Sequence, residues 1–155
     1  MTTVDQDNAT NVAIRHAESL ELWQEIIDEF GYHTEQKELR AIIEEDDDES
    51  RRALARRALA IMEDEGRDVL DWYHDISHAL DVEITGRLSE GRWELSGVAL
   101  LVCFGGPTVR YDAEDDDTIR VRVSWWGDSC SQVVRCGLAS ELWQFAENEA
   151  EAVAR

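Results

Sequence analysis

Two histidines four residues apart are the side chains whose spacing best suits metal chemistry. The segment HDISH places His74 and His78 so that, on a helix, both imidazoles could reach one ion, with Asp75 where a zinc protease has glutamate. At about 100° per residue, however, the surrounding apolar residues gather on one side of the helix and both histidines on the other. We therefore expect a solvated polar face, and a small metal-assisted hydrolase using these histidines stays an alternative.

The other potential nucleophiles and ligands form no recognisable set. Three cysteines, an odd number, have neither the paired spacing of a disulfide framework nor that of a zinc site. Cys103 lies in an apolar run and is expected to be a small core residue, while the roles of Cys130 and Cys136 stay open. Ser129 and Ser131 have no histidine nearby in the sequence. We expect no catalytic residues and no cofactor.

A Gly-Gly-Pro step interrupts the apolar run LLVCFGGPTVRYD at Gly105, Gly106 and Pro107. A phosphate-binding loop would need its glycines to open a helix, but the following TVRY is typical of a strand. The step is therefore interpreted as a structural turn, a bulge or bend between two strands. The alternative is a place where another backbone or a ligand comes close.

The segment TIRVRVSWW carries the best candidate for a binding surface. Alternation places Ile119 and Val121 toward a core and the arginines on the opposite face, with Trp126 continuing that polar face. Tryptophan and arginine dominate binding hot spots. We therefore predict a patch that contacts a protein partner, made of Arg110, Arg120, Arg122 and Trp126. The alternative is that the arginines pair with acids such as Asp112 and Asp115, and that the C-terminal helix covers Trp126.

The charge of the chain is strongly negative. Thirty-five acidic and 15 basic residues give a net charge of −20, and Lys37 is the only lysine. Because the shortage of lysine extends over the whole chain, we favour adaptation to concentrated salt, with no direct binding of nucleic acid. The alternative is an acidic mimic of nucleic acid that blocks a DNA-binding protein. Such a mimic would have little long-range field in about 1 M salt, where the Debye length is about 3 Å.

The periodicity predicts a single α+β domain over residues 1–155. Residues 1–80 are mainly helical: one helix ends before Gly31, a second starts at Thr34, and a long third helix is bent at Gly66. Residues 81–155 form a meandering antiparallel sheet of about four strands, with a C-terminal helix packed on one face. The chain carries no apolar run long enough for a membrane span and no secretory signal, so the expected location is the cytoplasm.

Four short motifs also carry a resemblance. They are LDVEITGR, LLVCFGGPTVRY, VSWWGDS and ELWQFAENEA, within residues 71–150. In these motifs the chain resembles a group of small acidic proteins of unknown function carried by phages, plasmids and integrated elements, in a haloarchaeal-type version. After Trp-Gly it departs from that group, with DSCSQVV in place of Thr-Pro and an aromatic residue. The resemblance implies a mobile-element context and supplies no activity. We therefore expect a non-catalytic protein-binding or accessory protein of a mobile element or its halophilic host, of unknown oligomeric state.

Overall fold

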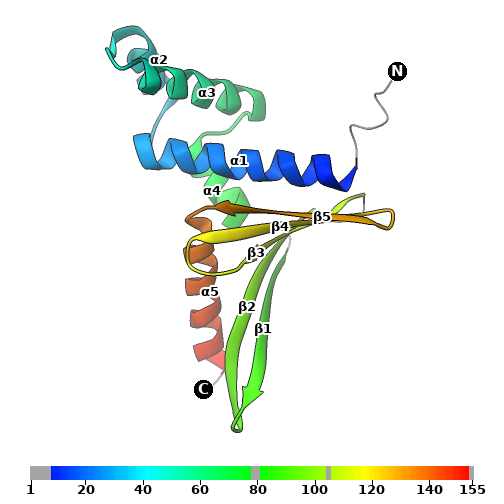
Figure 1. The fold of residues 1–155 in the computed structure, drawn as a ribbon. Coiled ribbons are helices and arrows are strands. Elements are labelled where there is room, and N and C mark those ends of the chain that lie inside the picture. Colours follow the sequence, from blue (N-terminus) through cyan, green and yellow to red (C-terminus); the bar gives the residue numbers. More distant parts are fainter. Residues whose placement is uncertain (1–7, 78–80, 104–105, 154–155) are drawn as a thin grey trace. The chain divides into compact units, whose positions relative to one another are not determined.

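The computed structural model describes residues 8–77, 81–103 and 106–153. Its α+β architecture has N-terminal helices, an antiparallel sheet and a C-terminal helix that packs on the sheet, which confirms the predicted fold class (Figure 1). The helices are α1 (Ala9–Phe30), α2 (Gln36–Glu45), α3 (Glu49–Glu65), α4 (Val69–Ser77) and α5 (Leu138–Val153).

The predicted long third helix is two helices, α3 and α4. Gly66 adopts a left-handed conformation with φ of 67° and ends α3 rather than bending it, because a left-handed residue cannot continue a right-handed helix. At the other end of α3, the Asp48 side chain accepts hydrogen bonds from the backbone N–H groups of Ser50 and Arg51. The second helix starts at Gln36 rather than Thr34, whose buried hydroxyl donates instead to the Phe30 carbonyl oxygen.

The sheet is a five-stranded meander with the order β1-β2-β3-β4-β5, and every neighbouring pair is antiparallel. The strands are β1 (Asp81–Ser89), β2 (Arg92–Cys103), β3 (Thr108–Ala113), β4 (Thr118–Trp125) and β5 (Asp128–Arg135). The prediction of about four strands omitted β5, which follows β4 through a two-residue turn.

The chain divides into two compact units. The helical unit comprises Leu22–Ser77, and the sheet unit comprises the described residues up to Glu21 and from Asp81 onward. In the helical unit the rings of Trp23 and Trp72 stack with centroids 5.1 Å apart. Their burial and that of Leu39 and Met62 give this unit its own apolar core.

In the sheet unit one face of the sheet is apolar and covered. Buried side chains on this face include Leu100, Val109 and Val121, and in β3 and β4 the buried residues alternate with more exposed ones. Helix α5 contacts β2, β3 and β4, and its buried Leu138 and Leu142 complete this core. The opposite face carries Arg110, Arg120 and Arg122, the arginines of the predicted binding patch, and is more exposed to solvent.

Candidate binding surface

Trp126 lies at the tip of the β4–β5 hairpin, with 93% of its surface exposed. Trp125 pairs directly with Asp128, so Trp126 and Gly127 form a two-residue turn. Both have positive φ angles, 51° and 81°, as in a type I′ turn. The prediction that Trp126 continues the polar face of the strand is therefore wrong, and so is the alternative that the C-terminal helix covers it.

Trp126 is an unusual residue for this position. A non-glycine residue in the left-handed region costs roughly 1–2 kcal/mol, which is why such turns favour Asn-Gly. Among the described residues, the other non-glycine residue with positive φ is Glu90, at 50°. Glu90 and Gly91 form the two-residue turn between β1 and β2, which has the same backbone pattern. The chain therefore holds two matched hairpin turns, one led by a solvated glutamate and the other by an exposed indole.

The start of α1 contacts the β4–β5 hairpin next to its tip. The backbone N–H of Ala9 donates to a carboxylate oxygen of Asp128 at 3.3 Å, and the Asn8 side chain caps the helix by accepting from the N–H of Asn11 at 2.8 Å. Two residues before the tip, Ser124 pairs with Ser129 across the strands. This hydrogen bond ties the residue that follows the turn to the first residue of α1.

The three arginines share one face of the sheet, as predicted, but they are paired with acids. Arg110 lies opposite Arg122 across β3 and β4, and Arg120 lies opposite Asp112. Asp112 forms ion pairs with both Arg110, at 3.3 Å, and Arg122, while Arg120 pairs with Glu114.

Glu83 adds a further ion pair to Arg110 at 3.3 Å. The alternative interpretation of the arginines, pairing with nearby acids, is thus confirmed with Asp112 as a shared partner. Glu114 takes the place expected for Asp115. Because exposed ion pairs contribute only about 0–1 kcal/mol each, these pairs matter mainly for cancelling the positive charge of this face. Trp126 lies in the turn beyond the end of β4, whereas the three arginines lie within β3 and β4.

The Gly-Gly-Pro step connects β2 to β3. Pro107 directly precedes β3, while Gly105 lies outside the described residues. Gly106 does not have a positive φ, and a Cβ added to it would meet no atom within 4 Å. The register irregularity in this region falls within β2, between Leu101 and Cys103. Gly106 therefore has room for a side chain in the connection between β2 and β3.

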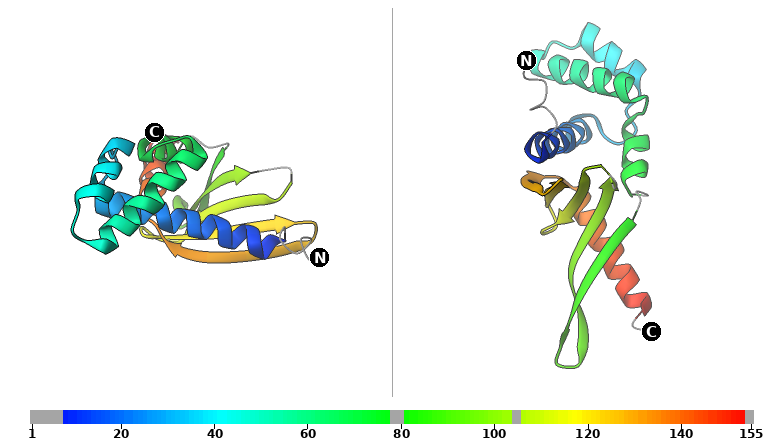
Figure 2. Two further views of the ribbon diagram at one scale, coloured as in Figure 1. Left: turned by 90° about the horizontal axis from the view of Figure 1, so that it is seen from above. Right: turned by 90° about the vertical axis from the view of Figure 1, so that its right-hand side faces the viewer.

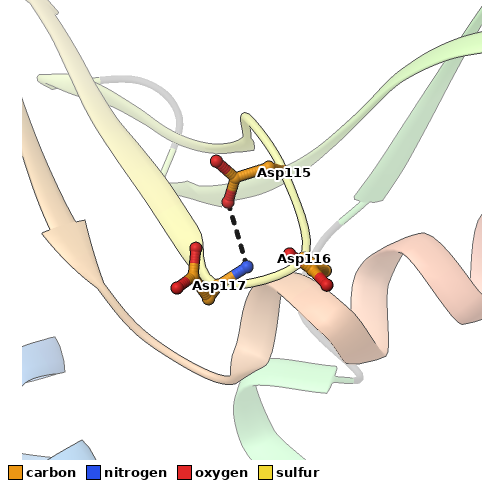
Figure 3. A group of neighbouring side chains, drawn as sticks. All are labelled: Asp115, Asp116 and Asp117. Atoms are coloured by element: carbon orange, nitrogen blue, oxygen red, sulfur yellow. Dashed lines mark hydrogen bonds between the residues drawn. The ribbon is translucent and has the colours of Figure 1, made fainter.

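The alternative metal site on His74 and His78 falls outside what the structure describes. His74 lies in α4, but its side chain is outside the described portion, and His78 is outside the described residues. The described potential ligands that do cluster are Asp115, Asp116 and Asp117 in the β3–β4 loop, all exposed (Figure 3).

This acidic loop has a structural explanation of its own. The backbone N–H of Asp117 donates to a carboxylate oxygen of Asp115 at 3.0 Å, and this bond is the main cause that lowers the pKa of the Asp115 carboxyl. The carboxylate therefore stabilises the turn between β3 and β4.

The cysteines are free thiols. Cys136, just before α5, is buried, whereas Cys103 and Cys130 are partly exposed. The small core thiol is thus Cys136 rather than the predicted Cys103.

Comparisons with protein-family models, curated proteins and solved structures find no match for this chain. The resemblance to small acidic mobile-element proteins therefore stays a prediction. No helix in the described ranges combines the length and apolarity that a membrane crossing requires.

Proposed function

We propose that this chain is a non-catalytic, salt-adapted binding protein that holds a protein partner through Trp126. The observation that carries the proposal is an indole that is 93% exposed in a left-handed turn position. Neither the exposure nor the backbone conformation stabilises the fold, so the residue type needs a reason outside folding. An aromatic anchor for a partner supplies that reason, because tryptophan is among the residues most enriched in binding hot spots.

The chemistry of the tip indicates what kind of partner surface it fits. An indole supplies a large apolar area and one N–H donor on a side chain with few rotatable bonds. The partner should therefore offer an apolar pocket, with a hydrogen-bond acceptor at its wall. Because the arginine face is already neutralised by Asp112 and Glu114, the partner needs no acidic surface, and the contact can persist in concentrated salt.

The distribution of charge supports adaptation to salt over a localised mimic of nucleic acid. Residues 22–77 carry 17 of the 35 acidic and 7 of the 15 basic side chains, so each unit has half of the net charge of −20. A mimic would concentrate its carboxylates on one surface, whereas a negative excess in both units suits hydration of the whole molecule. The mobile-element or halophilic context remains part of this proposal.

Affinity capture from the native cell in about 1 M potassium chloride tests the proposal with two matched variants. Trp126→Asn removes the indole and leaves a residue that suits the turn, while Glu90→Asn makes the corresponding change in the other hairpin. We expect wild type and Glu90→Asn to recover the same partner, and Trp126→Asn to lose it. Equal recovery by all three proteins, with unchanged circular dichroism, contradicts the proposal. It would leave the acidic surface as the better candidate.

A further inference from the structure

The outer half of the β1–β2 hairpin is a two-stranded ribbon. Strand β3 pairs with β2 only from Val98 to Cys103, so Arg92–Gly97 pairs with β1 alone. Figure 2 shows this ribbon running beyond the other strands, with α5 beside it. An isolated two-stranded hairpin is marginally stable in water, so the side chains on its faces need a cover.

The ribbon carries an apolar face built around Trp93. The Trp93 indole lies over Gly86 of the neighbouring strand, where an added Cβ would be 1.9 Å from a ring carbon. Leu88 pairs with Trp93 across the strands, and these two side chains are 79% and 48% exposed. The absence of a side chain at Gly86 thus lets the ring lie flat, and the resulting apolar face is only partly covered.

A groove of about 980 Å³ lies between this face and the last turns of α5. Ile84, Trp93 and Leu95 line it from the ribbon. From α5 it is lined mainly by glutamates, which lie at the exposed edge of the helix: Glu147, Glu149 and Glu151. The groove therefore combines an apolar wall with an acidic one.

The charges along the groove are unbalanced. Within the described ranges none of the three α5 glutamates that line the groove forms an ion pair, and one basic residue, Arg92, lines the opposite side. A second copy of this chain is a poor occupant, because it would bring its own net charge of −20 to an acidic rim. A cationic partner would match the rim, and apolar side chains would match the ribbon.

We propose that this groove binds a basic amphipathic helix from a partner protein. The apolar side chains of the helix, at spacings of three and four, pack against Trp93 and Leu95, and its flanking arginines or lysines meet Glu147 and Glu151. The site is separate from Trp126, which lies at the tip of the other hairpin and takes no part in lining the groove. It therefore does not depend on the proposed function.

Peptide binding to the intact protein tests the groove with a defined probe. The probe is a synthetic helix of about five turns with a leucine stripe and arginines beside it. Two control peptides carry glutamate in place of arginine, or the same residues in an order without a stripe. Fluorescence anisotropy at about 0.1 M and about 1 M potassium chloride measures the dissociation constants. We expect the basic amphipathic peptide to bind and both control peptides to bind at least tenfold more weakly.

Charge variants separate the groove from general attraction to an acidic protein. The triple variant Glu147→Gln, Glu149→Gln, Glu151→Gln should weaken binding about tenfold at the lower salt concentration. A matched triple variant removes three exposed charges from α2 and α3, through Glu44→Gln, Glu45→Gln and Asp64→Asn. It should leave binding nearly unchanged. An equal loss in both triple variants means non-specific attraction and overturns the proposal.

Variants of Trp93 test whether the apolar wall of the groove contributes to peptide binding. Trp93→Ala should weaken binding about tenfold at both salt concentrations, and Trp93→Phe, which keeps a flat ring, should retain most of the affinity. Trp126→Asn should leave peptide binding unchanged, so failure of this proposal and failure of the proposed function are distinguishable. If the protein binds the basic amphipathic peptide no better than the control peptides, the proposal is overturned. A dimer in sedimentation that disappears when Trp93 is replaced would also overturn it, because a second copy would then close the groove.

Discussion

Replacement of Trp126 by asparagine should stabilise the fold. The tryptophan has a φ of 51° and is 93% exposed, so its removal uncovers almost no apolar surface within the chain. A non-glycine residue in this region costs roughly 1–2 kcal/mol, and asparagine adopts it more readily. We therefore expect a gain of about 1 kcal/mol in the free energy of unfolding. For a chain of this length, that gain raises Tm by roughly 2–4 °C.

Thermal unfolding followed by circular dichroism, at a fixed high potassium chloride concentration, measures this gain. Glu90→Asn is the matched control, because Glu90 holds the same position in the β1–β2 turn with a φ of 50°. Both variants should gain stability to a similar extent, since high salt screens the charge lost at Glu90. A Tm that falls by several degrees for Trp126→Asn alone would refute the reasoning, because it would mean that the indole stabilises the fold.

Three further outcomes follow from the structure. Gly86→Ala should lower the free energy of unfolding by about 1–3 kcal/mol in urea titrations, because its Cβ would displace the Trp93 ring. Gly106→Ala is the control, because a Cβ at Gly106 has open space. Equal losses of stability in the two variants would contradict the packing of Trp93 on Gly86. Burial, and then the Arg15 charge, hold the pKa of His16 below 6.5 in the folded protein. The free energy of unfolding should therefore fall as pH drops below 6.5 toward that lowered pKa. A free energy of unfolding that rises on acidification would contradict the lowered pKa of His16. With a net charge of −20, Tm should rise across a potassium chloride series, and a flat or falling Tm would contradict adaptation to salt.

The class of the fold could be predicted from periodicity, but one strand could not. The change from helical spacing to alternation near residue 80 gives the α+β class, and Gly31 marks the end of α1 correctly. The sequence does not predict strand β5, because its turn lacks the Asn-Gly or Asp-Gly sequence that identifies two-residue hairpins. In the sequence a tryptophan at the first turn position resembles the last residue of a strand, which is why alternation places Trp126 on the sheet.

The candidate site could be predicted only in part. Alternation correctly placed Arg110, Arg120 and Arg122 on one face, and the same pattern could not show which acids they meet. The choice of acidic partner depends on strand register, which is not determined by composition. The register brings Asp112 between two arginines. The groove was also missed, because the contact between Trp93 and Gly86 requires the pairing of β1 with β2 across a bulge.

The most direct measurement of the central claim is the dissociation constant of the captured partner for three proteins in the same salt: wild type, Trp126→Asn and Glu90→Asn. A hot-spot tryptophan contributes about 2 kcal/mol or more, which corresponds to roughly thirtyfold in affinity. The account predicts at least that loss for Trp126→Asn, in a protein that is no less stable than wild type, and an unchanged constant for Glu90→Asn. Equal constants for Trp126→Asn and wild type would contradict the claim that the hairpin tip holds the partner.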